Sequence, residues 1–245
     1  MLDTRHKPAT ARMVATVQRV QRITPHMQRI TLGGAEIADF VASEAAGEAA
    51  PWVKLFLPCG QGRAYTLQDL NPVAGTLSLD FVLHAQEGQA GPAATWAQRA
   101  LVGERVGVAG PRSGGVELPA QARWILLAGD ATALPAIQSI ASRLPAGIQA
   151  KAYIEVFSEK DQQPIPSLAS LRLQWMNAQS EPGLALCQSL LYRPLPAGPG
   201  YIWMAGESAA MRRLRLHYLQ ERELPRSSVS AKGYWKSGES DHRDT

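Results

Sequence analysis

Four consecutive residues, Arg63-Ala64-Tyr65-Thr66, place a cation, an aromatic ring and a hydroxyl group on a segment that favours an extended strand. Side chains alternate along a strand, so Arg63 and Tyr65 are expected on one face and Thr66 on the other, unless a bulge intervenes. An arginine can fork onto a diphosphate. A tyrosine can stack on a flat ring, and a threonine can bond a ring nitrogen. The segment suits a flavin nucleotide; a buried strand with a surface arginine is the alternative interpretation.

A second segment, from Gly91 to Trp96, has the composition of a helix start with no large side chain before Thr95. The free backbone N–H groups and the positive dipole end of a helix start are what a diphosphate needs. We therefore predict cofactor contacts at Gly91, Ala93, Ala94 and Thr95.

The first half of the chain carries short strand patterns separated by turn residues. Strands are predicted at 12–23, 27–32, 52–57, 63–67, 76–84 and 105–109. A short helical piece is expected near 35–40, and a helix at 92–101. Many short strands with one late helix predict a small antiparallel β-barrel.

The pattern changes after a linker at 110–119 that is rich in glycine and proline. Strands are then predicted at 123–128, 150–157, 171–176, 201–205 and 227–234. Helices are expected after the first of these strands through residue 144, at 183–192, and from the fourth strand through 222. Alternating strands and helices predict a parallel sheet with right-handed crossovers. We place the two domains at 1–117 and 118–245.

Polar residues follow two strands of the predicted sheet, where ligands of open α/β sheets lie. Asp130 and Thr132 come after the first strand, and Glu207 comes after a later one. Neither a G-x-G-x-x-G nor a Walker sequence is present, so the common nucleotide fingerprints are excluded. A helix N-cap is the alternative role for Asp130 and Thr132.

Together these segments resemble the flavin-binding half of the ferredoxin–NADP reductase superfamily. Further residues sharpen the resemblance to the siderophore-interacting proteins, which are FAD-dependent ferric-siderophore reductases. The segments that carry it are 63–66, 80–84, 91–97, 129–136, 205–208 and 233–236. The resemblance implies an N-terminal antiparallel β-barrel that binds FAD and a C-terminal α/β parallel-sheet domain that binds NADPH or NADH.

The resemblance also implies roles for single residues. Thr66 is the catalytic residue, in the sense that its hydroxyl tunes the flavin. The FAD is expected to meet a barrel strand and the C-terminal strand, at Asp80, Val82, His84, Tyr234 and Trp235. The nicotinamide nucleotide is expected at the turn after the first parallel strand and after a later strand, at Asp130, Thr132, Ala133 and Glu207. Family members usually carry an acid where this chain has Ala131.

Three cations border the expected flavin edge, and we interpret Lys54, Arg112 and Lys236 as a basic clamp for an anionic ferric siderophore. Solvated surface charges are the alternative. A ferredoxin is a further candidate partner, and a monomer is expected. The choice between NADH and NADPH stays open.

The composition is that of a soluble globular protein, with 45% hydrophobic residues and a formal net charge of +4. No lysine- and arginine-rich run of the nucleic-acid type occurs, and the apolar runs are too short to cross a membrane. We therefore expect neither a nucleic acid nor a membrane as a partner. The N-terminus has no apolar signal segment, which predicts a cytoplasmic protein. Cys59 and Cys187 are expected to be free, buried thiols.

Hydrolysis is the sharpest alternative function, because the residues from Gly206 to Ala210 approach the G-x-S-x-G pattern of a nucleophile elbow. Only His217 and His242 follow Ser208, in a predicted helix and in the polar tail. We therefore expect Ser208 to be a residue of the first helical turn. A non-enzymatic siderophore or flavin carrier, and a flavin or ferredoxin-coupled reductase of the same fold, are further alternatives.

Overall fold

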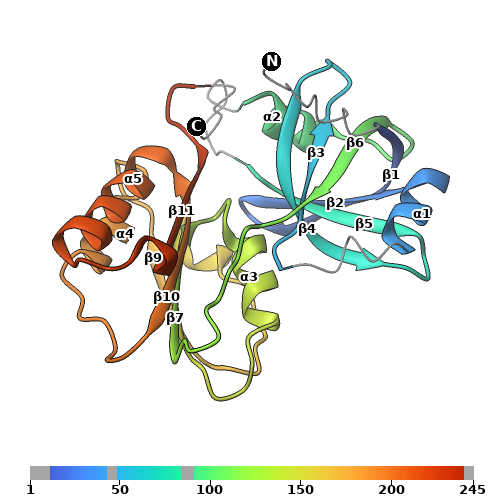
Figure 1. The fold of residues 1–245 in the computed structure, drawn as a ribbon. Helices are drawn as coiled ribbons and strands as arrows, with labels where there is room; N and C mark the ends of the chain where they lie inside the picture. The colour runs from blue at the N-terminus through green and yellow to red at the C-terminus, as the bar shows by residue number, and fades with distance from the viewer. Residues whose placement is uncertain (1–11, 43–48, 84–90, 240–245) are drawn as a thin grey trace, which may run out of the picture.

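A computed structural model describes residues 12–42, 49–83 and 91–239, and shows a barrel beside an α/β sheet (Figure 1). The barrel is closed and antiparallel, with the strand order β1-β2-β5-β4-β3-β6. Its strands are β1 (Met13–Thr24), β2 (Met27–Gly33), β3 (Trp52–Phe56), β4 (Gly62–Asn71), β5 (Thr76–Val82) and β6 (Arg105–Arg112). Two helices accompany it, α1 (Ala35–Ala42) and α2 (Pro92–Arg99). The predicted barrel is confirmed.

The barrel forms because alternate residues of its strands are apolar and point inward. On β3, Val53 and Leu55 are fully buried, whereas the alternate residues Trp52, Lys54 and Phe56 are half-buried. Leu77 and Leu79 of β5 are likewise fully buried and belong to the same core. The outward residues of β3 are therefore left free to face a ligand or solvent.

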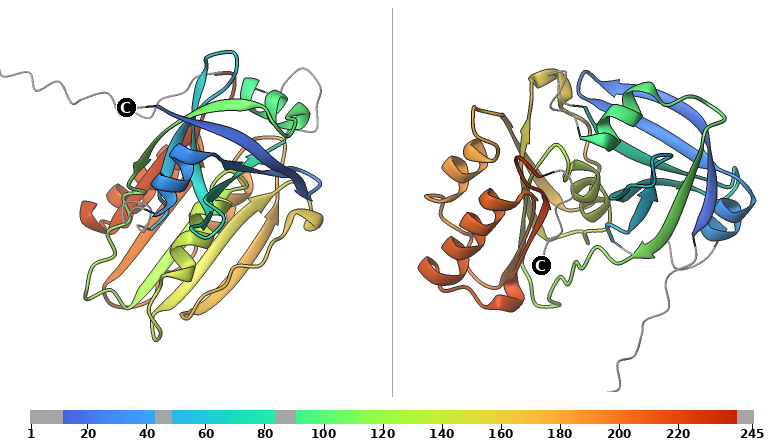
Figure 2. Two further views of the ribbon diagram at one scale, coloured as in Figure 1. Left: turned by 90° about the vertical axis from the view of Figure 1, so that its right-hand side faces the viewer. Right: turned by 90° about the horizontal axis from the view of Figure 1, so that it is seen from above.

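The second domain is a five-stranded parallel sheet in the order β11-β10-β7-β8-β9. Its strands are β7 (Trp124–Asp130), β8 (Gln149–Val156), β9 (Ser170–Asn177), β10 (Gly200–Glu207) and β11 (Val229–Trp235). Helix α3 (Leu134–Ser142) lies between the sheet and the barrel, while α4 (Leu184–Leu190) and α5 (Ser208–Leu216) cover the other face (Figure 2). The predicted parallel sheet is confirmed.

The alternation of side chains along the buried strands explains these two layers. Ile125 and Leu127 of β7 join the core around α3, whereas Leu126 and Ala128 join the core beneath α4 and α5. All seven residues of β7 are buried. A continuous apolar strand is what a parallel sheet covered on both faces requires.

Several local expectations were wrong. Strand β6 continues to Arg112, so the first residues of the expected linker are strand. Helix α3 has Ala133 as its N-cap, without a side-chain cap, so Asp130 and Thr132 do not cap it. Cys187 is buried as expected, but Cys59 is exposed; both thiols are free. His84 lies outside the described residues, and the domain division at 117 stays a prediction.

The two domains share part of one hydrophobic core. Met27 and Ala50 of the barrel side are buried within the cluster that surrounds α3. The Ala50 N–H donates to Ser139 Oγ of α3 at 3.0 Å, and Gln68 Nε2 of β4 donates to Gln138 Oε1 at 2.8 Å. The barrel is thus packed against α3 by both apolar and polar contacts.

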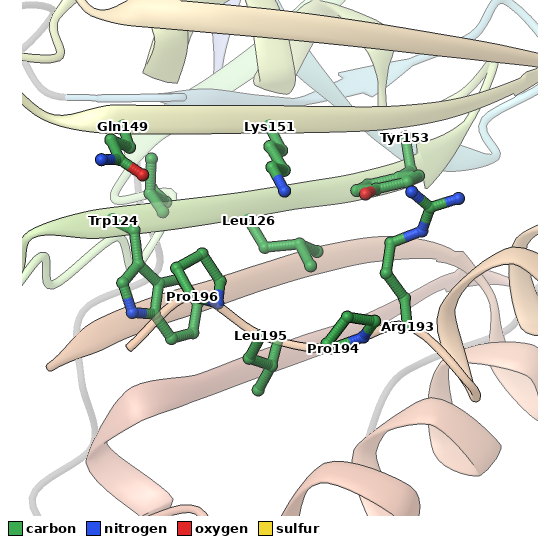
Figure 3. Close-up of a pocket in the computed structure, with 10 residues that line it drawn as sticks. Trp124, Leu126, Gln149, Lys151, Tyr153, Arg193, Pro194, Leu195 and Pro196 are labelled. Carbon is green, nitrogen blue, oxygen red and sulfur yellow. The ribbon is translucent and has the colours of Figure 1, made fainter. Parts of the chain in front are cut away.

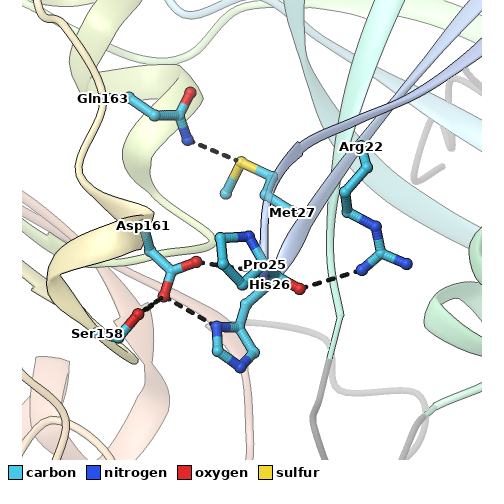
Figure 4. A network of polar contacts seen from close by, with 7 residues as sticks. All are labelled: Arg22, Pro25, His26, Met27, Ser158, Asp161 and Gln163. Carbon is cyan, nitrogen blue, oxygen red and sulfur yellow. Dashed lines mark hydrogen bonds and ion pairs between the residues drawn. The ribbon is translucent and has the colours of Figure 1, made fainter.

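A polar contact at the far end of the interface fixes the turn between β1 and β2 (Figure 4). Asp161 Oδ1 accepts the backbone N–H of His26 at 3.1 Å, and its Oδ2 lies 2.8 Å from His26 Nδ1. Oδ2 also accepts the N–H and the hydroxyl of Ser158, at 3.0 and 2.8 Å. Although burial acts in the opposite direction, these hydrogen bonds hold the pKa of Asp161 below its ordinary value.

We predict that Asp161→Asn lowers the free energy of unfolding by about 1–3 kcal/mol at neutral pH, because buried donors lose a charged acceptor. A carboxyl group with a lowered folded pKa stabilises fully above its unfolded pKa of about 3.9. That contribution disappears as pH falls through the folded pKa, so the variant and the parent should converge in acid. Urea unfolding at several pH values measures the difference. The exposed Asp39 provides the control Asp39→Asn; equal losses in the two variants would contradict the prediction.

Candidate functional site

The Arg63 to Thr66 segment forms the first half of β4, between β3 and β5 of the barrel. Arg63 is half-buried, and its guanidinium donates to the Gly62 carbonyl at 2.9 Å. The Tyr65 ring packs on Phe81 of β5 with 4.3 Å between centroids, and burial raises the pKa of its hydroxyl. Ala64 is exposed, whereas Thr66 and Leu67 are both buried, so the expected alternation fails after Thr66.

Aromatic contacts connect this strand with the start of α2. Phe81 touches Tyr65 on one side and Trp96 of α2 on the other, with 5.6 Å between the latter centroids. The N-cap of α2 is Gly91, which supplies no side-chain cap, and a Cβ there would meet nothing within 4 Å. Among the described residues, no side chain caps the start of α2, and the Cβ position at Gly91 is open. Both features fit the diphosphate of a flavin nucleotide.

A hydrogen bond joins the barrel to the last strand of the sheet. The side chains of Thr66 and Tyr234 are joined by a hydrogen bond, although the two residues belong to different domains. The Tyr234 ring meets Trp203 of β10 edge-on, at 6.5 Å between centroids. Tyr234 keeps 37% of its surface exposed, yet burial of its hydroxyl raises its pKa to about 12. Thr66 therefore lies at the junction of the two domains, as an interdomain flavin site requires.

The carboxyl ends of β7, β10 and β11 are tied together by Asp130. Its Oδ1 accepts the N–H and the hydroxyl of Thr132, at 2.9 and 2.5 Å. Its Oδ2 accepts the Glu207 N–H at 3.0 Å and Trp235 Nε1 at 2.8 Å. Burial raises the pKa of Asp130, although these hydrogen bonds oppose the shift. Four residues predicted to contact the cofactors thus form one network.

The other predicted cofactor residues have different surroundings. Asp80 is buried and forms a two-pronged ion pair with Arg29, at 2.7 and 2.8 Å, so its carboxylate is already engaged within the barrel. Val82 is half-buried and packs against the core around α3, and Ala133 is fully buried before α3. The Glu207 carboxylate accepts the Ala210 N–H at 3.0 Å and caps α5.

Comparisons with known proteins agree with this geometry. The sequence profile described as siderophore-interacting protein matches residues 122–238, and the one described as siderophore-interacting FAD-binding domain matches 16–62 and 59–115. The chain belongs to the siderophore-interacting protein family. The FAD-binding match coincides with the barrel, and the other match covers the parallel sheet.

Three members or relatives of this family illustrate the similarity. The chain is 29% identical over 91% of its length to the mycobactin import ATP-binding/permease protein IrtA of Mycolicibacterium smegmatis, but it spans only 26% of that protein. It is 30% identical to the ferric acinetobactin reductase of Acinetobacter baumannii, over 74% of the chain and 63% of that protein. The crystal structure of a siderophore utilization protein from T. fusca has a TM-score of 0.81 and 28% identity, and covers 95% of both chains.

The family resemblance led us to expect a basic clamp, and two of its three members lie on neighbouring barrel strands. Lys54 and Arg112 lie on the paired strands β3 and β6, where Trp52 is the register partner of Arg112. The Arg112 guanidinium lies 5.1 Å from the Trp52 ring centroid. Lys236 is exposed and forms an ion pair with Glu239 instead. The sequence interpretation did not anticipate the ion pair of Lys236 with Glu239. It also did not assign Phe81 and Trp203 to the site, because a buried aromatic residue on a strand indicates only core.

The hydrolase alternative finds no support in the described residues. Ser208 is the first residue of α5, as expected. His217 lies about 13 Å away along the same helical axis and contacts Glu221 at 2.8 Å. His242 lies outside the described residues. No group of three metal-ligating side chains is found in the part of the chain that the structure describes.

None of the described helices combines the length and the apolarity that a membrane span needs. A hollow near Trp124, Lys151 and Arg193, on the sheet face away from the barrel, encloses only about 10 Å³ (Figure 3). It contains none of the predicted site residues.

We predict that Gly206→Ala disrupts the Asp130 network. The Gly206 φ of +153° favours glycine, and an added Cβ would lie 2.7 Å from Asp130 Oδ2. The clash should displace Asp130 from Trp235 and cost about 1–3 kcal/mol of stability. Gly103→Ala is the matched control, since Gly103 has a φ of +94° and open space around it. Thermal unfolding of both variants tests the prediction, and equal shifts would contradict it.

Proposed function

We propose that the protein is a ferric-siderophore reductase that uses NAD(P)H as the electron donor and FAD as the bound cofactor. The observation that carries the proposal is the hydrogen bond between Thr66 of the barrel and Tyr234 of the sheet, beside the Asp130 network. When bound, FAD supplies a hydride acceptor and a source of single electrons for ferric iron. The similarity to a protein named ferric acinetobactin reductase supports the same reaction.

The residues of the barrel have the roles of holding and orienting the cofactor. Arg63 and the N-terminus of α2, with Gly91, Ala93, Ala94 and Thr95, bind the diphosphate. Tyr65 stacks on the flavin ring while Phe81 supports it from behind. Thr66 offers its hydroxyl to the reactive part of the ring. No protein acid or base is needed, because only electrons pass to the iron and the proton released with them can go directly to solvent.

The sheet domain holds the nicotinamide nucleotide at the carboxyl ends of its strands. Thr132 and Ala133 line the turn after β7, and Asp130 fixes that turn. Glu207 holds the start of α5, and Trp235 joins this edge to β11. Asp80 and Val82 contribute to the FAD side through the backbone of β5, since the Asp80 carboxylate is bound to Arg29.

Lys54 and Arg112 attract an anionic ferric siderophore to the exposed flavin edge. We propose a cytoplasmic location and a monomeric protein, with a ferredoxin as an alternative electron acceptor. A flavin or ferredoxin-coupled reductase would share the fold and the cofactor but not the ferric acceptor.

The purified protein tests the proposal in two steps. Heat release and mass determination should identify FAD, and recovery of FMN alone would contradict it. NAD(P)H oxidation should then depend on an added ferric siderophore, with Fe(II) captured by a ferrous chelator. A protein that oxidises NAD(P)H only with free flavin or ferredoxin would be the alternative reductase, and one that binds without turnover would be a carrier.

We predict that Arg63→Ala weakens FAD binding about ten- to a hundredfold, because a charge-assisted hydrogen bond contributes about 1.5–3 kcal/mol. The apoprotein should still fold. Equilibrium titration with FAD measures the change, and Arg105→Ala on the exposed surface of β6 is the control. An unchanged affinity in the Arg63 variant would exclude a diphosphate contact.

We predict that Thr66→Val slows flavin reduction by NAD(P)H while FAD stays bound, because the shape is kept and the hydroxyl is lost. Tyr234→Phe removes the other end of the same interdomain hydrogen bond. If Thr66 acts on the flavin, Tyr234→Phe should not reproduce the slow step in stopped-flow measurements. An unchanged rate in Thr66→Val would show that the residue is structural.

A further inference from the structure

The edge strand β9 lacks the features that normally keep a sheet edge from pairing. Such edges are commonly blunted by a proline, a bulge, several charges or a short length. Strand β9 has eight residues, contains no proline, and pairs with β8 without a shift in register. Its single charged residue is Arg172. Among the described residues, β8 is its only neighbouring strand. The outer edge of β9 is therefore available to a further strand.

The hydrogen bonds to β8 show which backbone groups of β9 point outward. The Ser170 N–H donates to the Ile148 carbonyl at 3.2 Å, and the Ala178 N–H donates to the Val156 carbonyl at 2.7 Å. In a parallel pair, alternate residues direct both the N–H and the carbonyl to the same neighbour. The even-numbered residues of β9 therefore bond β8. The odd-numbered residues direct these groups outward, and they are Leu171, Leu173, Trp175 and Asn177.

The two faces of β9 differ in character. Leu171 and Trp175 are half-buried and pack against the core around α3, and Leu173 between them is 41% exposed. We call these three residues the apolar face. Arg172 and Gln174 lie on the opposite face, because side chains alternate along a strand. An added strand would thus meet apolar side chains on one face and polar ones on the other.

The polar face gathers positive charge. Lys151 of β8 is the register partner of Arg172, and like charges directly opposite each other destabilise a sheet. Lys151 and Arg193 lie on the same side of the sheet, beside Tyr153 (Figure 3). The Arg193 guanidinium lies 5.2 Å from the Tyr153 ring centroid. Within the described ranges, no carboxylate forms an ion pair with Lys151, Arg172 or Arg193, which we call the cationic face. An anion bound there would offset the repulsion.

We propose that the outer edge of β9 binds an extended segment of another protein in which acidic and apolar residues alternate. The segment adds a sixth strand to the five-stranded sheet, and its backbone bonds the outward groups of β9. Its acidic side chains lie on the cationic face, and its apolar side chains lie on the apolar face. An antiparallel pairing of β9 with a second copy would bring two cationic faces together, so charge favours the acidic partner.

The edge of β9 is separate from the proposed cofactor and substrate sites. It lies four strand positions from β11, which is about 19 Å at the spacing of adjacent strands. Changes at this edge should therefore leave NAD(P)H-dependent ferric reduction intact. Peptide binding and turnover thus test two different claims.

The probe is a capped, fluorophore-labelled peptide of alternating glutamate and valine, with eight residues to match β9. Fluorescence anisotropy with the FAD-loaded protein should show saturable binding that weakens as salt rises. The corresponding lysine–valine peptide should bind at least about tenfold more weakly, because the cationic face repels it. Amide hydrogen exchange should slow in residues 170–177 when the glutamate–valine peptide is bound.

Two variants remove the two kinds of interaction. Leu173→Pro deletes an outward N–H that β8 does not use, and edge strands tolerate proline at such positions. Arg172→Glu reverses a charge of the cationic face. Each should weaken glutamate–valine binding about tenfold, and Arg172→Glu should bind the lysine–valine peptide more tightly than the wild type does. The exposed Arg226 provides the control Arg226→Glu, whose affinity should stay within about twofold of the wild type.

Modified peptides test the backbone contacts without changing the protein. One peptide is N-methylated at every valine and the other at every glutamate, so that only one of them keeps the N–H groups that face β9. One should bind at least about tenfold more weakly than the other. Equal binding of both would contradict strand addition.

FAD content and thermal unfolding establish that each variant is folded. Wild-type affinity in Leu173→Pro and Arg172→Glu would overturn the inference while leaving the reductase function intact. No binding to the wild type at about 1 mM peptide would overturn it as well. Protection of residues 170–177 that rises with protein concentration in the absence of peptide would show a second copy at this edge, and would also overturn it.

Discussion

The packing of the barrel against the sheet domain is the constraint on which the proposed site depends, and the hydrogen bond between Thr66 and Tyr234 lies where the two domains meet. A flavin nucleotide that receives hydride from one domain and is held by the other needs a constant distance between the two. The shared core around α3, which includes Met27 and Ala50, prevents the domains from separating at that point. The contact between His26 and Asp161 fixes the other end of the interface.

The barrel and the sheet domain contribute different structural features to the proposed site. The closed barrel leaves no unpaired strand edge and presents β4 and α2 as a rigid support for a dinucleotide. The parallel sheet brings the ends of β7, β10 and β11 to one edge, where the Asp130 carboxylate accepts four hydrogen bonds. A buried carboxylate costs free energy unless its oxygens are satisfied, so this network is stable only when all three strand ends are in place.

Patterns within a few residues allowed most of the fold to be predicted. Alternation identified the barrel strands, and continuous apolar runs identified the sheet, because both signals are local. The contact of Thr66 with Tyr234 could not be derived in this way, since no local pattern specifies which strands meet across domains. Asp130 was interpreted as a possible cap because its neighbours suit one, but its Oδ2 accepts hydrogen bonds from Trp235 and Glu207 on distant strands, and its Oδ1 accepts from Thr132. The pairing of Lys236 with Glu239 is local, because a turn at residues 237 and 238 brings the two side chains together.

The central claim is that electrons pass from NAD(P)H through protein-bound FAD to ferric iron. Anaerobic stopped-flow mixing of the NAD(P)H-reduced holoenzyme with a ferric siderophore tests it most directly, with flavin absorbance and Fe(II) capture recorded together. The account predicts that the oxidised flavin spectrum returns while Fe(II) appears in proportion to the electrons released. A flavin that stays reduced with anionic and neutral ferric siderophores, yet is oxidised at once by a ferredoxin or by free flavin, would contradict it.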